Sequence, residues 1–453
     1  MGVMVLVRVF TSLMGVSLGF AASHALQAQW TVACFWTKDF KSTDSAITNC
    51  NHIIYEFVNV SGWPLPYAYH NIDPDTLTLN FNFTHEGYQN VMSWKERNPN
   101  VTVELSIGDW QTPKQLYDIA RNRESRKKFI DSSIKVLEKY RLDGLHLMWG
   151  SPAQDAKEYF INSTTAEIEK ENLTNLTKEL NMRLKQANFS FSFGIRGVLE
   201  IDCNMEVEEV YNNADLVFVY AYGYHGSWEE STGAYAPIYP GLEGTERVNS
   251  YYMTVDSTWD TLEVWGGKPD KTVLVISAKG NPFKLTNTSQ HDISAASEKG
   301  WISPITFTNI CKRQLNETEP NWSIVWDNTR KQSYTYRGNS WITYEDVCSV
   351  IEKKKYAREK NFRGLALKDL SRDDANGDCV RKTLPLLVTG SKSDNSVNVS
   401  QIGKSAVYLD ATFPLLRIIA EETEQSNPCN GSCGNFDAYF RSKLLLLLLL
   451  VQL

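Results

Sequence analysis

Short apolar runs alternate with longer segments in which apolar residues recur every three or four positions, from Trp30 to Leu387. The longer segments predict helices, among them Arg126–Tyr140 and Thr165–Gln186. The short runs predict eight β-strands: Thr31–Trp36, His52–Val60, Val101–Ile107, Gly144–Trp149, Phe189–Gly194, Leu216–Tyr222, Thr272–Ala278 and Phe362–Leu367. Strands that alternate with helices form a parallel sheet, and eight such units are typical of an α/β protein with a closed TIM (β/α)8 barrel.

The chain length of 453 residues suits one barrel of roughly 250 residues with insertions and tails. The net charge is -7 and the pI about 5.7, which argues against a nucleic-acid partner. The first 28 residues contain one basic residue, Arg8, then an apolar run as far as Ala22 and small residues at Ala25 and Ala28. We therefore expect residues 1–28 to be a secretory signal peptide.

Asparagine sequons support export from the cell. The expected glycosylation sites, each in Asn-x-Ser/Thr, are Asn59, Asn82, Asn100, Asn162, Asn172, Asn175, Asn188, Asn287, Asn316, Asn321, Asn398 and Asn430. Several of them fall in polar, turn-like stretches that would hold a glycan in water, and a dense glycan coat would suit a cell-surface protein.

Eight cysteines, an even number in a chain expected to be exported, indicate disulfides. No Cys-x-x-Cys pair with a nearby histidine completes a zinc site, and no second histidine stands at a ligand spacing from His146. We therefore expect neither a metal nor another cofactor. Spacing alone leaves every pairing of the cysteines open.

The stretch Leu-Asp-Gly-Leu-His-Leu-Met-Trp-Gly-Ser-Pro, residues 142–152, joins a predicted strand to a turn. It resembles strand four of the family 18 glycoside hydrolases, the chitinases and chitinase-like lectins, whose pattern is Asp-Gly-x-Asp-x-Asp-Trp-Glu-x-Pro. The matching residues are Asp143, Gly144, Trp149 and Pro152. In place of the family's inner Asp, Asp and Glu stand His146, Met148 and Gly150, which alternate along the strand and share one face.

Further motifs extend the resemblance over residues 30–387. Residues 50–57 are similar to the family's Cys-Thr-His-Leu-Ile-Tyr-Ala-Phe, 106–110 to its Ser-x-Gly-Gly-Trp, and 222–228 to its Met-x-Tyr-Asp-Phe-His-Gly-Ser-Trp. The resemblance implies a small α+β insertion between strands seven and eight, at 285–356. It also implies the disulfides Cys34–Cys50 and Cys311–Cys379. Among Cys203, Cys348, Cys429 and Cys433 we favour a bridge between the last two.

Glycoside hydrolysis requires a protonated carboxyl group beside the departing oxygen. In family 18 the substrate's own acetamido group is the second participant, and the inner Asp orients it. Gly150 has no proton to donate and Met148 cannot orient an acetamido group, so we expect no catalytic residue here. The resemblance implies further losses: Gly223 replaces the strand-six Asp, Asn281 stands near an expected Arg, and Lys368 replaces the strand-eight Trp on which the central sugar stacks.

Four sugar-facing aromatic residues survive in the alignment, namely Tyr55, Phe57, Trp110 and Tyr222. Aromatic residues on barrel strands are also common in the core, which is our interpretation of Trp149. New charged residues gather at the same strand ends: Asp109, Lys279, Lys368 and Asp369. They are solvated rim residues, or they line a remodelled pocket, or they fill the mouth with ion pairs, because an unpaired buried charge is costly.

After Leu387 the composition predicts a linker or extension over residues 388–435, with an apolar run at Phe413–Ala420. Residues 444–453 are almost pure leucine, and a helix of that length spans about 15 Å, half the hydrocarbon thickness. Small residues around Ser432, a polar spacer and this terminus fit a lipid-anchor signal, residues 436–453, with Ser432 as the attachment site. The alternative is an unprocessed hydrophobic end.

The leading hypothesis is a secreted or cell-surface chitinase-like protein without hydrolase activity, which binds a glycan or a protein partner and is held at the membrane by the lipid anchor. A rival is an active glycosidase on N-acetylglucosamine-containing glycans with a relocated acid, for which Asp109 is the nearest candidate. A third hypothesis is an interaction scaffold whose cleft is blocked.

Overall fold

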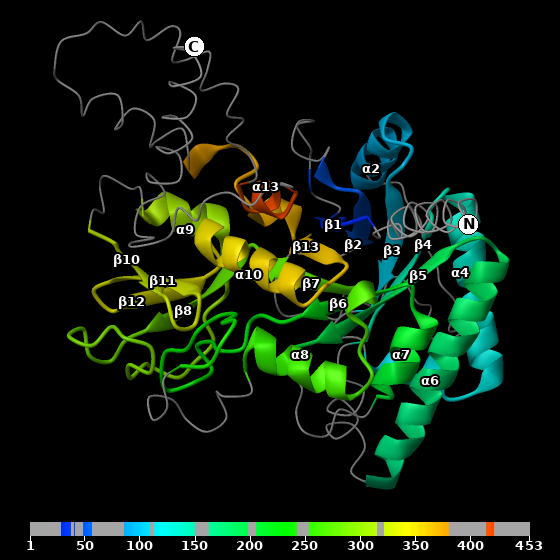
Figure 1. The fold of residues 1–453 in the computed structure, drawn as a ribbon, viewed down its shortest axis with the longest axis horizontal. Coiled ribbons are helices and arrows are strands. Elements are labelled where there is room, and N and C mark those ends of the chain that lie inside the picture. Colours follow the sequence, from blue (N-terminus) through cyan, green and yellow to red (C-terminus); the bar gives the residue numbers. More distant parts are fainter. Residues whose placement is uncertain are drawn as a thin grey trace, which may run out of the picture. The chain divides into compact units, whose positions relative to one another are not determined.

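Eight parallel strands close into a barrel, as the sequence predicts. The computed structural model describes residues 29–37, 40, 49–56, 86–108, 113–149, 163–197, 205–241, 253–314, 321–379 and 414–420. The strand order around the barrel is β1-β13-β7-β6-β5-β4-β3-β2 (Figure 1). The strands are β1 Thr31–Thr37, β2 His52–Glu56, β3 Thr102–Ile107, β4 Gly144–Met148, β5 Ser190–Arg196, β6 Leu216–Tyr220, β7 Thr272–Ser277 and β13 Gly364–Lys368. Each predicted strand overlaps an observed one, and β6 ends earlier than expected, shortly before the left-handed Gly223 at φ +70°.

Helices surround the barrel strands (Figure 1). They are α2 Glu86–Arg97, α3 Pro113–Ala120, α4 Arg123–Lys139, α6 Ser163–Gln186, α7 Val207–Asn213, α8 Val255–Val264 and α10 Val347–Glu359, with the short 3-10 turns η4 Pro269–Lys271 and η5 Leu370–Arg372. The predicted helices correspond to α4 and α6. Helix α4 begins where the Asn122 side chain accepts a hydrogen bond from Ser125 N, at 2.9 Å. Its buried residues Phe129, Val136 and Leu137 recur at helical spacing.

Alternate strand residues fill the barrel lumen. One apolar cluster unites Phe35 of β1, Ile54 of β2, Phe218 of β6, Val275 of β7 and Ala366 of β13. Because strand side chains alternate with a period of two, the same face continues to Glu56 and Lys368 at the strand ends. Glu56 and Lys368 therefore lie at the carboxyl ends of the strands, where barrels of this type hold their sites.

A separate antiparallel sheet lies between β7 and β13, in the order β10-β11-β12-β8-β9. Its elements are β8 Lys279–Lys284, β9 Ile305–Thr306, α9 Phe307–Gln314, β10 Ser323–Asp327, β11 Gln332–Arg337 and β12 Ser340–Tyr344. The insertion starts earlier than the expected Leu285, because β8 follows β7 after the single residue Ala278. It also ends before Tyr356, which belongs to α10, the helix that leads into β13.

Both disulfides that the resemblance implies are present, Cys34–Cys50 and Cys311–Cys379. The first joins β1 to the start of β2, and the second ties α9 of the insertion to the chain beyond β13. Cys348 is also disulfide-bonded, and its partner lies outside the described residues. The remaining three cysteines, Cys203, Cys429 and Cys433, include that partner and all lie outside the described residues, so the Cys429–Cys433 bridge stays a prediction.

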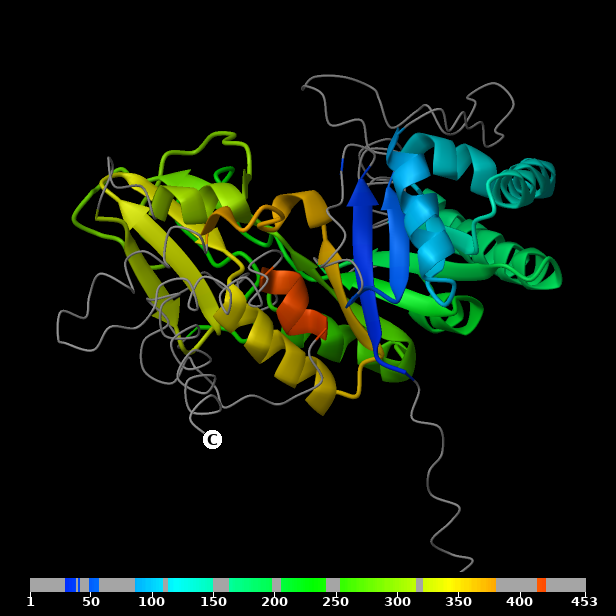
Figure 2. The same ribbon diagram turned by 90° about the horizontal axis from the view of Figure 1, so that it is seen from above.

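The apolar run in the predicted linker forms the helix α13, Pro414–Ala420, which packs against α10 and β13 (Figure 2). Leu416 and Ile419 are fully buried, and Asp373 accepts a hydrogen bond from Leu416 N at 3.1 Å. This part of the extension is therefore a docked element, because its apolar face requires burial. The expected signal peptide, anchor signal and Ser432 lie outside the described residues. Among the described helices, none has the length and apolar character needed to cross a membrane.

Candidate ligand site at the barrel mouth

Strand β4 presents His146 and Met148 to the barrel lumen. His146 is fully buried, and Met148 packs in the apolar cluster with Phe35. A Cβ atom on Gly194 of β5 would lie 2.5 Å from Met148 Sδ and 3.2 Å from His146 Nε2, so this glycine makes room for both side chains. The described strand therefore places an imidazole and a thioether where the family has carboxylates. Gly150, the position of the family's proton donor, lies outside the described residues.

His146 is held in a chain of hydrogen bonds. Its Nδ1 lies 2.8 Å from Ser192 Oγ, and its Nε2 lies 3.0 Å from the Tyr220 hydroxyl. Ser192 Oγ donates to Glu104 Oε2, and a hydroxyl group has only one proton to donate. Ser192 therefore accepts from His146 Nδ1, and the Tyr220 hydroxyl donates to Nε2. The chain runs from Tyr220 through His146 and Ser192 to the carboxylate of Glu104.

Glu104 is the acceptor at the base of this chain, and it is 1% exposed. Ser190 Oγ donates to its Oε1 at 2.6 Å, and His52 Nε2 lies 3.2 Å from its Oε2. Burial lowers the pKa of His146 well below its ordinary value, and Lys368 and His52 act in the same direction. The imidazole is therefore neutral, and both of its nitrogens are hydrogen-bonded to residues inside the barrel. It has no free position from which to act as an acid toward a ligand.

An ion pair takes the place of the expected stacking Trp. Lys368 at the end of β13 pairs with Glu56 at the end of β2, and their side chains are 24% and 9% exposed. Lys368 Nζ also lies 4.6 Å from the ring centroid of Phe35 and 5.3 Å from that of Tyr220. An ammonium group is attracted to an aromatic face at these distances. Lys368 therefore turns into the barrel, and its interpretation as a solvated rim residue is wrong.

A second ion pair lies beside the first. Asp369 is 4% exposed and accepts from Arg372 Nε at 2.5 Å and from Ser371 Oγ at 2.6 Å. Burial raises the pKa of the Asp369 carboxyl, but Arg372 and Ser371 outweigh it, so the pKa is lower than usual.

Lys279 completes the cluster and makes no ion pair with any described residue. Burial, followed by the nearby Arg372, lowers the pKa of its amine to about 8. Among the described residues, no group of three or more His, Cys, Asp or Glu side chains could hold a metal ion.

The structure separates the aromatic residues expected to contact a ligand. Tyr55 is fully buried and lies on the face of β2 opposite Ile54 and Glu56, toward the helices rather than the lumen. Its expected ligand contact is therefore not supported by this placement. Tyr222 lies at the mouth and stacks on Tyr235, with ring centroids 5.9 Å apart. Phe57, Asp109 and Trp110 lie outside the described residues and stay predictions.

Three other residues singled out from the sequence have structural roles. Asn281 Nδ2 donates to His225 O at 2.7 Å, which ties β8 to the loop after β6. Gly223 adopts φ +70°, a conformation that an aspartate rarely takes. Trp149 is 1% exposed and packs edge-on against Tyr117, so its interpretation as a core residue agrees with the structure.

Sequence reasoning missed several residues of the mouth and its hydrogen-bond chain, namely Glu56, Glu104, Ser192, Tyr220 and Arg372. Two of them carried a signal. Glu56 stands where the family motif has Ala, and Glu104 is a charge inside the predicted apolar strand Val101–Ile107. A charged residue in a buried strand requires a partner in the barrel.

The asparagines expected to carry glycans differ in how exposed their side chains are. Asn100, Asn188, Asn287 and Asn321 are exposed, and Asn175 is partly buried in α6. Asn172 is buried, and its Nδ2 donates to Glu169 Oε2 at 3.3 Å. This burial argues against a glycan at Asn172. The remaining sequons, Asn59, Asn82, Asn162, Asn316, Asn398 and Asn430, lie outside the described residues.

The barrel, its insertion and the strand-four motif match one family. The profile described as "Glycosyl hydrolases family 18" matches residues 31–373. The chain belongs to this family. Its relatives include human "Chitinase-3-like protein 2", 26% identical over 356 residues, which cover 77% of this chain and 86% of the relative. "Probable chitinase 10" of Drosophila melanogaster is 27% identical over 350 residues, which cover 75% of this chain but only 14% of that much longer protein.

Solved structures support the same fold. The group IV chitinase of Ostrinia furnacalis superposes with a TM-score of 0.70 at 21% identity, over 86% of this chain and 98% of that chain. YKL-39, solved in the presence of chitooligosaccharides, gives a TM-score of 0.68 at 20% identity, over 88% of this chain and the whole of that chain. Both are therefore similar in architecture, although few of their residues are shared with this chain.

Proposed function

We propose that this family 18 protein is a chitinase-like binding protein that does not hydrolyse glycosides. The observation that carries the proposal is the inner face of β4, where His146 is neutral and bonded at both nitrogens and Met148 is packed in the apolar cluster. With Gly150 in the donor position, this strand supplies no acid for the departing oxygen.

Turnover of chitin oligomers tests this proposal. The purified protein should release no more product from tetra-N-acetylchitotetraose than a buffer control, with an active chitinase assayed in parallel. Clear turnover that is lost in Asp109→Asn would contradict the proposal and support the rival glycosidase. Turnover that survives Asp109→Asn would also contradict it, since an acid elsewhere would then be at work.

A second candidate function, an interaction scaffold with a blocked cleft, is favoured by the Lys368–Glu56 pair. The ammonium group covers the rings of Phe35 and Tyr220, on the surface where the central sugar would stack. Loss of the stacking Trp and of two polar contacts should remove roughly 0.5–1.5 kcal/mol for each interaction, or about tenfold to a thousandfold in affinity if all three are lost. Calorimetry with the same tetrasaccharide measures this. Tight binding that is abolished by Trp110→Ala would contradict the blocked cleft.

The proposed location is extracellular, at the cell surface, through a lipid on Ser432. The support is the composition of residues 430–453, small residues followed by a spacer and a leucine run too short to span a bilayer. Phosphatidylinositol-specific phospholipase should release the protein from intact expressing cells. Retention on the cells after treatment with verified active enzyme would count against the anchor.

A further inference from the structure

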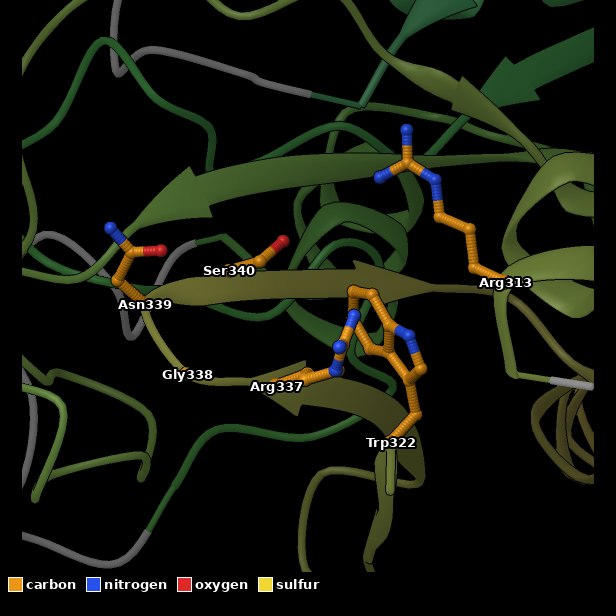
Figure 3. A pocket seen from close by; sticks show the side chains of 6 residues that line it. All are labelled: Arg313, Trp322, Arg337, Gly338, Asn339 and Ser340. Carbon is orange, nitrogen blue, oxygen red and sulfur yellow. The ribbon is translucent and has the colours of Figure 1, made fainter. Parts of the chain in front are cut away.

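A second concave site lies on the insertion, outside the barrel. Its volume is about 720 Å³, within the range of small-ligand sites, roughly 300–1,000 Å³. The described residues that line it are Arg313, Trp322, Arg337, Gly338, Asn339 and Ser340 (Figure 3). They come from the end of α9, the start of β10 and the turn between β11 and β12. We call this site the insertion hollow.

The insertion hollow is cationic. Two guanidinium groups line it, from Arg313 and Arg337, and none of its described lining residues carries a carboxylate. Arg313 is exposed and makes no ion pair or hydrogen bond with a described residue. The adjacent Lys312, by contrast, pairs with Asp378 at 2.7 Å. The whole chain has a net charge of -7, but the two arginines, with Arg313 unpaired among the described residues, make the hollow locally basic.

The other lining residues add the contacts that a sugar uses. Trp322 is partly buried and offers a flat apolar ring, which can pack against the apolar face of a pyranose. The side chains of Asn339 and Ser340 make no hydrogen bond with a described residue and can bond to sugar hydroxyls. The turn that carries them is open, because a Cβ on Gly338 would meet nothing within 4 Å. It is also fixed, because Leu285 N donates to Asn339 O at 2.8 Å.

We propose that the insertion hollow binds an anionic saccharide, a sugar that bears a sulfate or a carboxylate group. Guanidinium groups from two elements bind such an oxyanion through charge-assisted hydrogen bonds, and the indole face sets the sugar ring beside it. A neutral saccharide would supply no counter-charge to Arg313, which has none among the described residues. The site is separate from the barrel mouth and does not depend on the function proposed there.

Three matched probes test the proposal: 6-sulfo-N-acetyllactosamine, sialyl-N-acetyllactosamine and N-acetyllactosamine. The full chain is produced with neutral oligomannose glycans, so that a glycan at the predicted site Asn321, which is exposed, carries no anion. Ligand-observed NMR titration gives each Kd. We expect at least one charged probe to bind roughly tenfold more tightly than the neutral probe, and its affinity to fall between 50 and 300 mM NaCl. The two charged probes distinguish a sulfate from a carboxylate ligand.

Variants locate the binding. Arg313→Gln should weaken the charged probe about tenfold and leave the neutral probe unchanged. The control is Lys331→Gln. Lys331 directly precedes β11, whose other end is Arg337, and its loss should change the affinity less than about twofold. An equal loss in both variants would indicate general charge attraction and overturn the site. Equal binding of all three probes, or no binding at millimolar concentration, would also overturn the site. The same holds if the Arg313→Gln variant keeps both the melting temperature and the affinity of the wild type.

Discussion

The barrel mouth and the insertion hollow carry similar side chains in opposite arrangements. At the mouth, Lys368 pairs with Glu56 and Arg372 pairs with Asp369, so most of the charge is neutralised within the protein. At the insertion hollow, Arg313 has no described acidic partner. A ligand at the mouth must displace existing interactions, whereas a ligand at the hollow supplies missing ones.

The barrel differs from the hollow because its polar and charged groups pair with one another. The lumen holds the hydrogen-bond chain from Tyr220 through His146 to Glu104, and the mouth holds ion pairs such as Lys368–Glu56. These interactions pair the polar groups with one another, and they stabilise the barrel because unpaired buried groups would be costly. Mutations can test whether the mouth and lumen depend on such internal pairing while the insertion does not.

The largest expected effect is from Glu104→Ala. It removes the acceptor of Ser190 and Ser192 and the neighbour of His52, so the free energy of unfolding should fall by about 3–5 kcal/mol. Urea unfolding measures it. The comparison variant is Glu298→Ala, which breaks an insertion pair with Lys284 that is about half exposed and should cost about 0–1 kcal/mol. Equal losses would mean that the lumen does not depend on its buried carboxylate.

A smaller loss is expected from Lys368→Met, which leaves the nearly buried Glu56 without its cation. The free energy of unfolding should fall by about 2–3 kcal/mol, and the double variant Lys368→Met with Glu56→Gln should recover most of the loss. A double-mutant cycle at pH 7 gives the coupling energy. Additive losses would show that the two side chains do not stabilise each other, which would argue against an internally closed mouth.

The two regions also differ in what the sequence could predict. Apolar periodicity located the eight strands, and the family motif located the altered face of β4, because both depend on local spacing. The partners at the mouth could not be predicted in this way. Lys368 and Glu56 are 312 residues apart, and Ser192 and Glu104 are 88 apart. A two-residue period shows which face of a strand a side chain occupies. Which side chains meet across the lumen depends on how the sheet closes into a barrel.

A pH-dependent effect of intermediate size is expected at Lys279. The pKa of its amine is about 8 in the folded protein, against an ordinary 10.5. Below pH 8 both folded and unfolded chains bind the proton. Between pH 8 and 10.5 the unfolded chain alone retains it, so this group makes the protein more stable as the pH rises through that window. The gain should reach about 2 kcal/mol, allowing for partial exposure.

The matched variant for that window is Lys279→Met, compared with the wild type by urea unfolding at pH 7.5, 9 and 10.5. The wild type should gain stability relative to the variant across these values. A constant difference at all three would mean that the amine titrates normally and is solvated like a rim residue.

The smallest expected effect is on activity, from Met148→Asp combined with Gly150→Glu. This pair restores the family's acids on strand four, yet turnover of tetra-N-acetylchitotetraose should stay at background. Lys368 still covers the lumen aromatics, Asn281 remains bonded to the backbone, and Gly223 supplies no carboxylate. Catalysis tolerates little misplacement of the substrate. Adding Lys368→Trp separates the causes: turnover that appears only in the triple variant would make the ion-paired mouth the remaining barrier, and turnover in the double variant would show that the mouth never excluded the sugar.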